Sequence, residues 1–387
     1  MQHPKPYHYI IVGAGLFGAT FARLATDAGC RCLVIDKRHH TGGNIHCENI
    51  DGITVHAYGA HIFHTDSSKI WDFVNSFVPF NRFTNSPLAI APDGNIYNLP
   101  FNMNTFHQIW PDVVTPQQAQ LRIEQQRAQA ERIMAADGVT TPRNLEEMAL
   151  SLVGSDIYRL LVKGYTEKQW GRPCAQLPAF IIKRLPVRFT YDNNYFNDPF
   201  QGIPVGGYNA LIDRLLEGAD ILLDTDFFNN PDHWKSLGNT LVFSGRIDQF
   251  YNFRYGRLEY RSLRFETSVL NTPNAQGNAV VNYTDAQVPY TRIIEHKHFE
   301  AFGNNVYKNP RTVLTHEYPA QWQEGMEPFY PVNDQTNQTL YNQYRLLAES
   351  ETNVIFGGRL AEYRYYDMAP VIARAMELFE KHHDGPR

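Results

Sequence analysis

Short apolar runs at both ends of the chain predict the strands of one domain. Tyr9–Val12 and Cys32–Ile35 are nearly unbroken apolar runs near the N-terminus, as is typical of buried strands. Two further runs, Ile221–Leu223 and Thr240–Phe243, indicate that the chain returns to this domain later. The run Asn353–Phe356 ends in a glycine pair, and helical spacing begins soon afterwards, which predicts one more strand, turn and helix.

The middle of the chain has two other patterns. Between residues 102 and 162 the spacing predicts helices, and Asn144 after Pro142-Arg143 marks a helix start. Another helix is expected at Tyr208–Leu216. Residues 255–318 alternate in the manner of antiparallel strands, with breaks at Pro273-Asn274 and Gln276–Asn278. The expected helices of the first of these regions are Gln117–Ala136, Leu145–Leu152 and Ile157–Val162.

Composition adds limits to this picture. A chain of 387 residues exceeds what one core usually serves, so two or three domains are expected. With 43% hydrophobic residues and a formal charge of −5, the chain gives no reason to expect nucleic acid as a partner. The uncharged stretch 9–22 is too short to span a bilayer, and no signal peptide is recognisable. We therefore expect a cytoplasmic protein without membrane insertion.

A glycine motif follows the first apolar run. The run leads into Gly13-Ala14-Gly15-Leu16-Phe17-Gly18, and Asp36 ends the second run. The first glycine permits a tight turn, the second lets a pyrophosphate approach the backbone, and the third lets the following helix pack on the strand. An acid at this distance would accept hydrogen bonds from a ribose diol. The combination predicts a dinucleotide-binding unit.

The residues that follow narrow the dinucleotide to FAD. After Asp36-Lys37-Arg38 comes Thr41-Gly42-Gly43-Asn44, which resembles the second glycine pair of glutathione-reductase-like FAD proteins. Near the C-terminus, Gly357-Gly358-Arg359 and then Asp367-Met368 precede a helical pattern. The N–H groups at the start of that helix would face the flavin edge that carries negative charge on reduction.

The cysteines and glycines leave the purpose of a flavin open. Cys30, Cys32, Cys47 and Cys174 include no Cys-x-x-Cys pair of the kind that flavin disulfide reductases use. No second Gly-x-Gly-x-x-Gly is present, so no separate NADPH domain is expected. The sequence therefore predicts a flavin without a resident reductant or redox disulfide.

Several unusual segments carry a family resemblance. Gly59–Thr65, Lys163–Gly171, Lys183–Arg188, Pro289–Lys297 and Tyr363–Asp367 closely resemble the corresponding segments of the bacterial UDP-galactopyranose mutases, over about residues 7–380. Lys163–Gly171 has too many functional side chains for a plain strand or helix, and we interpret it as a binding segment.

The family implies a fold and a chemistry. The fold is α/β: a Rossmann-like FAD-binding domain of the glutathione-reductase type, with an inserted helical domain and an antiparallel β-sheet domain. Reduced FAD acts as a nucleophile in this family, forming an adduct between flavin N5 and sugar C1. UDP-galactopyranose and UDP-galactofuranose are interconverted without net redox change, supplying galactofuranose for cell-surface polysaccharide. The flavin is reduced from outside, by NAD(P)H or a chemical reductant, and a homodimer is common.

The resemblance also implies domain boundaries. The FAD-binding domain is expected at 1–80, 205–250 and 332–387, and the helical domain at 100–165. The sheet domain, which binds the substrate, is expected at 81–99, 166–204 and 251–331.

Site residues are implied in the same way. Arg184 and Arg292 match the two arginines that clamp the substrate diphosphate, which suits planar guanidinium groups. Arg184 lies on the family's mobile loop, at about 179–190. The residues expected to bind the substrate are completed by Tyr165 and Trp170 at the uridine and by Tyr195, Tyr330 and Tyr365 at the phosphates.

His61 and His64 match a histidine pair beside the flavin, and His64 is expected to be catalytic together with the two arginines. A zinc site is the alternative for two histidines at this spacing, but no carboxylate or cysteine pattern accompanies them, so no metal is expected. The full set expected at the cofactor is Gly13, Gly15, Phe17, Gly18, Asp36, Lys37, Gly43, Asn44, His61, Arg359, Asp367 and Met368.

Alternatives remain open from the sequence. Three segments depart from the common family forms, namely Leu161-Val162, Leu88–Ile90 and Phe329. The alternative is therefore a mutase for another nucleotide sugar, such as UDP-N-acetylgalactosamine or dTDP-fucose. A flavin amine or sugar oxidase would share the architecture without a phosphate clamp. A FAD-fold binding protein of the Rab-escort type would keep the glycine turn without flavin. Core packing is the alternative for the tyrosines and for Trp170.

Overall fold

The computed structural model describes residues 5–184 and 186–383, without the side chains of Lys183 and Arg184. These residues separate into two compact units. The first unit lies within Met1–Arg82, Asp198–Tyr260 and Pro328–Arg387, and the second lies within Phe83–Asn197 and Arg261–Glu327. The predicted helical and sheet domains both fall in the second unit. Their separation into two domains therefore stays a prediction.

A parallel sheet forms the centre of the first unit. Among the described residues it has five strands in the order β16-β10-β1-β2-β9, and each neighbouring pair is parallel. Ile11 of β1 lies opposite Val34 on one side and Val242 on the other, and all three are fully buried. The predicted strands are confirmed with small shifts, as β1 (Tyr7–Val12), β2 (Cys32–Ile35), β9 (Asp220–Leu222), β10 (Gly238–Phe243) and β16 (Val354–Phe356).

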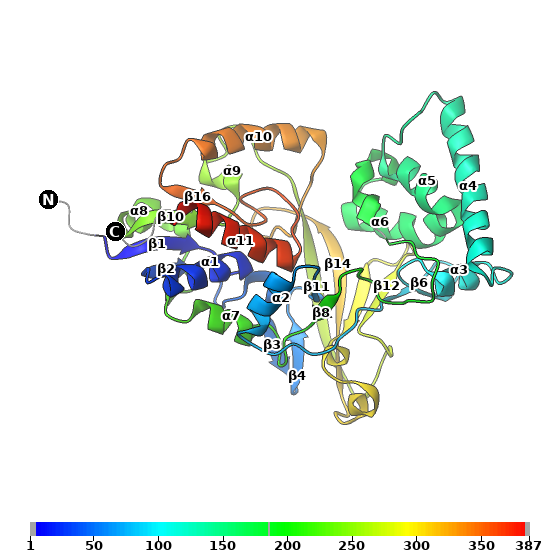
Figure 1. Ribbon diagram of the computed structural model, residues 1–387, viewed down its shortest axis with the longest axis horizontal. Helices are drawn as coiled ribbons and strands as arrows, with labels where there is room; N and C mark the ends of the chain where they lie inside the picture. Colours follow the sequence, from blue (N-terminus) through cyan, green and yellow to red (C-terminus); the bar gives the residue numbers. More distant parts are fainter. Residues whose placement is uncertain (1–4, 185, 384–387) are drawn as a thin grey trace. The chain divides into compact units, whose positions relative to one another are not determined.

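Two helices that meet beside this sheet begin near the predicted cofactor residues. They are α1 (Leu16–Asp27) and α11 (Met368–His382), which lie side by side in blue and red in Figure 1. The ring of Phe21 meets that of Phe379 edge-on, with centroids 5.5 Å apart. Small residues of α1 such as Ala19 and Ala22 are fully buried, which permits close packing.

The remaining elements of the first unit connect these parts. Its other helices are α2 (Ser68–Asn75), α7 (Asn209–Leu216), α8 (Pro231–Leu237), α9 (Ile247–Phe250) and α10 (Gln335–Glu349). Its other strands are β3 (Cys47–Ile50), β4 (Ile53–His56), β5 (Phe63–Thr65), β8 (Phe200–Gly202) and β15 (Tyr330–Pro331). Short 3₁₀ turns lie at η1 (Gly43–Ile45) and η5 (Phe227–Asn229).

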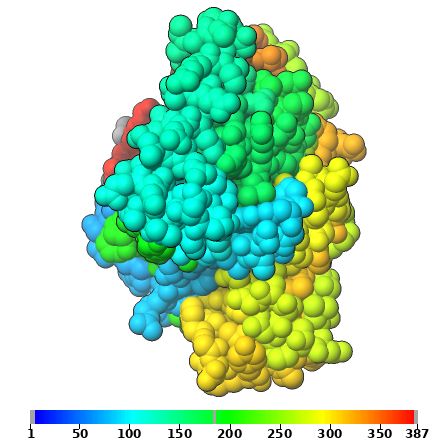
Figure 2. All heavy atoms as spheres, turned by 90° about the vertical axis from the view of Figure 1, so that its right-hand side faces the viewer, coloured from blue at the N-terminus to red at the C-terminus, as the bar shows by residue number. Residues whose placement is uncertain are grey.

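The second unit contains the predicted antiparallel strands. Within its described residues the order is β11-β14-β13-β12-β6-β7, antiparallel except where β12 pairs with β6. Figure 2 shows part of this sheet segment in yellow beside the helical segment in cyan and green. The strands are β6 (Leu88–Ile90), β7 (Ile96–Asn98), β11 (Tyr260–Leu270), β12 (Val280–Tyr283), β13 (Arg292–Glu295) and β14 (Thr312–Gln321).

The helices of the second unit begin as their sequences predict. Thr115 and Gln118 form a capping box at the start of α4, where Pro116 is the first residue. The Asn144 side chain accepts a hydrogen bond from the Glu147 N–H at the start of α5. The helices are α3 (Met103–Ile109), α4 (Pro116–Ala136), α5 (Leu145–Ile157), α6 (Lys163–Trp170) and the π-helical turn η2 (Tyr158–Val162), with 3₁₀ turns at η3 (Cys174–Gln176), η4 (Ala179–Arg184), η6 (His296–Phe299) and η7 (Gly303–Tyr307).

The segment with many functional side chains is helical. Residues 163–170 form the regular helix α6, whereas its side chains had suggested more than a plain strand or helix. The helix ends at Gly171, whose φ of 65° is left-handed and whose N–H donates to the Glu167 carbonyl. No described residue of α6 is fully buried, so the helix lacks the apolar stripe by which its spacing could be recognised.

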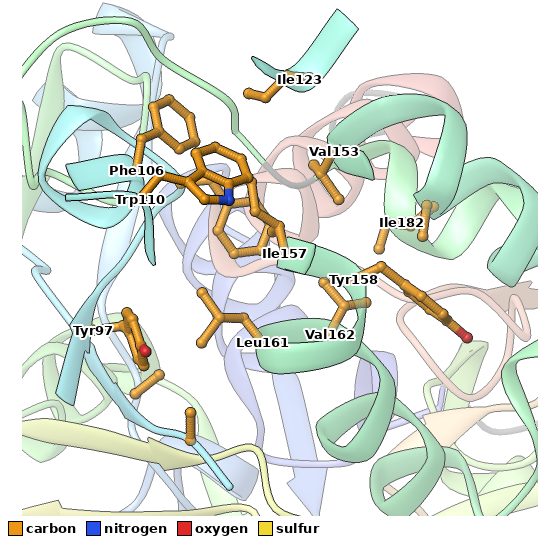
Figure 3. Close-up of a cluster of buried hydrophobic side chains, with 14 of the residues drawn as sticks. Tyr97, Phe106, Trp110, Ile123, Val153, Ile157, Tyr158, Leu161, Val162 and Ile182 are labelled. Carbon is orange, nitrogen blue, oxygen red and sulfur yellow. The ribbon is translucent and has the colours of Figure 1, made fainter. Parts of the chain in front are cut away.

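A hydrophobic cluster supports the helices of the second unit. Figure 3 shows Ile157 and Leu161 near Phe106 and Trp110, and all four side chains are buried. The indole N–H of Trp110 is satisfied by the Asp156 carboxylate at 2.8 Å. The cluster therefore joins α3 to α5 and to the turn that leads into α6.

Shortening Ile157, which is fully buried, should destabilise this cluster. The substitution Ile157→Ala removes packed methyl groups and leaves a cavity, which we expect to lower the free energy of unfolding by about 2–5 kcal/mol. Ile133→Ala is the matched control, because Ile133 is 59% exposed and should change the free energy by no more than about 0.5 kcal/mol. Urea unfolding followed by tryptophan fluorescence measures both. Equal unfolding midpoints for the two variants would show that the cluster is not a stabilising core.

Candidate functional site

Close backbone contacts hold the glycine turn between β1 and α1. Gly13 has a left-handed φ of +108°, and a Cβ there would lie 2.2 Å from the Ser244 Oγ. A Cβ at Gly18 would lie 2.0 Å from the Gly13 carbonyl oxygen. The Ser244 hydroxyl donates to the Val12 carbonyl at 2.7 Å and fixes the end of β10 against the turn. The first and third glycines are therefore required by the protein's own packing.

The second glycine differs from these two. A Cβ on Gly15 would meet only the Gly43 Cα, at 3.8 Å, so the chain itself leaves room for one. Gly15 is also the N-cap of α1, and no described side chain caps that helix or adds an acid to its first turn. By contrast, the Ser67 side chain caps α2. A helix start whose N–H groups are not capped by a side chain suits the pyrophosphate of a dinucleotide.

Asp36 lies beside the turn at the end of β2. Its carboxylate accepts the N–H of Ala14 at 2.7 Å and that of Arg38 at 2.9 Å. A carboxylate can accept about four hydrogen bonds, so capacity remains for a ribose diol. The Arg38 guanidinium donates to the Asn44 side chain at 2.9 Å and lies over the Tyr58 ring at 4.7 Å. Lys37 is exposed.

The start of α11 carries a second group of predicted residues. Tyr365 donates to the carboxylate of Asp367, the N-cap, at 3.0 Å, and that side chain makes no capping hydrogen bond to α11. Arg359 donates to the backbone carbonyls of Phe329 and Tyr366, and its guanidinium lies 4.9 Å from the Tyr365 ring. The rings of Tyr330 and Tyr365 have centroids 6.0 Å apart. This group continues toward α1, because Phe17 packs on Gly357 and Gly358.

The two predicted histidines have different partners. His61 contacts the Gly59 carbonyl through Nδ1 at 2.8 Å, and its own carbonyl accepts the Tyr208 hydroxyl at 3.0 Å. His64 pairs with the Asp198 carboxylate through Nδ1, at 2.5 Å. A carboxylate at Nδ1 fixes the ring and directs Nε2 away from it. Among the described residues, no group of three or more histidine, cysteine or acidic side chains could hold a metal ion.

Arg292 of the second unit is held between an acid and a phenol. Its Nε lies 3.1 Å from the carboxylate of Glu317, whose side chain is only 3% exposed. Its Nη2 donates to the Tyr165 hydroxyl at 2.6 Å. Burial raises the pKa of Tyr165, while the nearby Arg292 charge opposes that shift. The two contacts orient one side of the guanidinium, while burial keeps the Tyr165 hydroxyl protonated at physiological pH.

Two other predicted residues of this unit make contacts of a different kind. Trp170 packs against the hydrophobic cluster, in keeping with the core-packing alternative. Tyr195 donates its backbone N–H to the Asn85 carbonyl at 2.7 Å, and its ring contacts that of Phe196. The side chain of Arg184 lies outside the described residues.

Sequence reasoning missed four residues that contact the predicted ones. They are Ser244, Arg38, Asp198 and Glu317. Arg38 follows Lys37 directly, and its charge next to the second glycine pair was a usable signal. The other three meet their partners through contacts between distant segments, which neither spacing nor composition reveals.

The first unit's geometry fits FAD. Gly15 and Gly43 approach closely at an uncapped helix start, and Asp36 ends the adjacent strand. A second helix start, that of α11, has no side-chain cap among the described residues and follows the tyrosine and arginine group. A parallel sheet with these features defines a dinucleotide-binding flavoprotein fold. No helix in the described part of the chain has the length and hydropathy needed to cross a membrane.

Comparison with known proteins agrees with this class. Residues 160–365 match the UDP-galactopyranose mutase family, and residues 11–77 match an NAD(P)-binding Rossmann-like domain. The chain is 39% identical to a dTDP-fucopyranose mutase of Escherichia coli, over 95% of this chain and 96% of the relative. It is 37% identical to a probable UDP-galactopyranose mutase of Klebsiella pneumoniae, over 96% of this chain and 94% of the relative.

A solved structure supports the fold. The crystal structure of a reduced UDP-galactopyranose mutase superposes with a TM-score of 0.72 at 14% identity, covering 97% of this chain and 95% of the other. The chain belongs to the UDP-galactopyranose mutase family, whose members are isomerases with a flavoprotein fold. The family and fold predicted from the sequence are thereby confirmed.

Two glycine substitutions separate cofactor approach from protein packing. Gly15→Ala should leave the apoprotein nearly as stable as the wild type, because the new Cβ meets only Gly43 Cα at 3.8 Å, yet it should lower flavin content strongly. Gly18→Ala should lower both stability and flavin content, because its Cβ would lie 2.0 Å from the Gly13 oxygen. Thermal melting of the apoprotein and flavin absorbance per protein measure the two effects. A Gly15→Ala protein with full flavin content would contradict the assignment of this turn.

Proposed function

We propose that this chain binds FAD and interconverts UDP-galactopyranose and UDP-galactofuranose without net oxidation or reduction. Family membership supports the reaction class. The observation that carries the proposal is that the first unit has a glycine turn suited to FAD, while the second unit has Arg292, a guanidinium oriented by Glu317 and Tyr165. Reduced FAD supplies the nucleophile for the anomeric carbon, and an external donor such as NAD(P)H or a chemical reductant reduces it.

The cofactor residues have separable roles in this proposal. Gly15 and Gly43 admit the pyrophosphate to the start of α1, and Asp36 accepts from the ribose. Gly13, Phe17 and Gly18 shape the turn, while Asn44 and Lys37 flank it. Arg359 and Asp367 hold the segment before α11, and Met368 begins that helix, whose positive end stabilises negative charge on the flavin edge.

The substrate residues bind and orient the nucleotide. Arg292 and Arg184 hold the diphosphate, which is bound before the reaction and gains charge as it leaves. Tyr195 and Tyr330 donate hydrogen bonds to its phosphates, and Tyr365 does so by exchanging the Asp367 carboxylate for a phosphate oxygen. Tyr165 and Trp170 bound the uridine. Glu317 neutralises part of the Arg292 charge and keeps its guanidinium in one orientation, so less freedom is lost when the diphosphate binds.

His64 is proposed to act on protons near the reacting sugar. Its Nδ1 is held by Asp198, and Nε2 is the atom that would hold or move a proton as the sugar ring opens and closes. His61, fixed by the contacts to Gly59 and Tyr208, is proposed to contact the flavin.

A second candidate substrate has a specific observation in its favour. The relative with 39% identity over nearly the whole chain is a dTDP-fucopyranose mutase. Both candidates share a nucleoside diphosphate on a six-carbon sugar, so the same diphosphate clamp serves either. They differ at C6 of the sugar, in the base and in the 2′-hydroxyl of the nucleoside.

We further propose a homodimer in the cytoplasm that supplies the furanose sugar for cell-surface polysaccharide. All four cysteines lie in the described part of the chain and none of them forms a disulfide there, as suits a reducing compartment. Light scattering coupled to size exclusion tests the dimer by mass.

The substrate is tested by assaying the reduced protein against a panel of nucleotide sugars. UDP-galactopyranose, UDP-N-acetylgalactosamine and dTDP-fucopyranose are compared by kcat/KM, with products separated by chromatography. We expect UDP-galactofuranose to form with the highest kcat/KM. A higher value for dTDP-fucopyranose would select the second candidate, and no conversion of any sugar by a flavin-loaded reduced sample would overturn the mutase proposal.

The clamp is tested by Arg292→Ala. Loss of a charged hydrogen-bonding partner costs about 1.5–3 kcal/mol, which is roughly a 10- to 150-fold fall in kcat/KM, while flavin content stays at the wild-type level. Arg264→Ala is the matched control, because Arg264 is exposed on β11 and pairs with Glu266. Steady-state kinetics of the two reduced proteins make the comparison. Normal turnover of Arg292→Ala would remove Arg292 from the clamp.

A further inference from the structure

Lys168 of α6 uses its ammonium group to hold backbone from another part of the second unit. Its Nζ donates to the carbonyls of Tyr283 at 2.8 Å, Val288 at 3.0 Å and Tyr290 at 2.9 Å. An ammonium group has three N–H donors. All three donors of Lys168 are therefore directed at backbone oxygens.

These three carbonyls belong to the connection that leads to Arg292. Tyr283 is the last residue of β12, and Val288 and Tyr290 lie in the loop before β13, which begins at Arg292. The loop is tied to the sheet where the Thr291 carbonyl accepts the Tyr283 N–H at 2.8 Å. Lys168 thus contacts both ends of the loop, and its contact with the Tyr290 carbonyl is two residues from Arg292.

The same helix also contacts the Arg292 side chain. Tyr165 lies three residues before Lys168, so the two side chains share one face of α6. Tyr165 accepts the Arg292 hydrogen bond at 2.6 Å. Gly164 brings the helix close to the loop, because a Cβ there would lie 2.1 Å from the Thr284 carbonyl oxygen. The helix therefore fixes both the backbone before Arg292 and its guanidinium.

We propose that Lys168 is a positioning residue for substrate binding: by holding the 283–290 backbone it sets where Arg292 meets Tyr165 and hence the diphosphate. The inference rests on the proposed role of Arg292 in binding the diphosphate. Lys168 itself touches no reacting atom in this account.

The charge of Lys168 provides a signature that a merely structural residue would lack. Burial lowers the pKa of Lys168 to about 8, while the nearby carboxylate of Asp285 acts in the opposite direction. Further charged groups that face α6 are Arg261 of β11, which donates to the Gln169 carbonyl at 3.0 Å, and Arg292, which donates to Tyr165 and pairs with Glu317. Below pH 8 the ammonium serves three carbonyls, and above it a neutral amine keeps two N–H donors, so the loop is held less firmly as the pH rises.

The chain offers a matched control in Lys297. Its Nζ donates to the carbonyls of Pro273, Val306 and Asn309, at 2.7, 2.9 and 3.0 Å. These carbonyls belong to segments other than the loop before Arg292. Lys168→Met and Lys297→Met therefore remove the same number of charged hydrogen bonds from backbone carbonyls of one unit.

The test is calorimetric titration of the oxidised, flavin-loaded protein with UDP, which needs no turnover. We expect Lys168→Met to weaken UDP binding roughly tenfold, as a displaced binding group does, and Lys297→Met to bind UDP like the wild type. The double variant is titrated alongside. Adding Lys168→Met to Arg292→Ala should not weaken UDP binding further, because the lysine acts through that arginine.

A pH series on the wild-type protein covers the case in which Lys168→Met does not fold. UDP affinity should fall as the pH rises from 7 through 8 to 9, and Lys297→Met should show the same fall. The inference would be overturned if UDP affinity did not change over this pH range, or if a folded Lys168→Met protein bound UDP like the wild type. Either result would leave the proposed function intact. Failure of the wild-type protein to bind UDP would overturn the proposed function and this inference with it.

Discussion

The approach of the α1 start to the end of β1 is the contact on which the cofactor site depends. Gly13 and Gly18 let the strand, turn and helix touch through backbone atoms, and Ser244 ties the neighbouring strand to the same point. A side chain at Gly18 would push α1 away from the end of β1, and one at Gly13 would collide with Ser244 at the end of β10. Because the helix start has no side-chain cap among the described residues, its N–H groups suit an anion.

The second unit holds the side chain of Arg292 in a fixed orientation. Arg292 is fixed by a buried acid, a half-buried phenol and, through the backbone, by a lysine on the same helix as the phenol. A guanidinium held in this way loses little freedom when it binds a diphosphate. Precise placement matters for a reaction in which the same diphosphate must leave and return to one carbon, because a pyrophosphate that drifts leaves the sugar exposed to water.

Local sequence predicted the parts of this molecule that depend on local physics. Apolar runs located the parallel strands within a few residues, and the glycine spacing located the turn, because both reflect neighbours in the chain. Helix α6 was not recognised because it has no apolar stripe, and its side chains instead contact segments that are distant in the sequence. Asp198 and Glu317 were missed because each meets its partner only after distant segments pack together. The family resemblance supplied the candidate substrate residues, which spacing alone could not have selected.

The central claim is that the glycine turn holds a flavin whose reduced form drives an isomerisation with no net electron transfer. It is tested most directly by following UDP-galactopyranose conversion in one anaerobic, flavin-loaded sample, first oxidised and then after reduction with dithionite. The account predicts no furanose product before reduction, and many turnovers per flavin afterwards without further reductant. Equal conversion in both states, or product limited to one equivalent per reduced flavin, would contradict it.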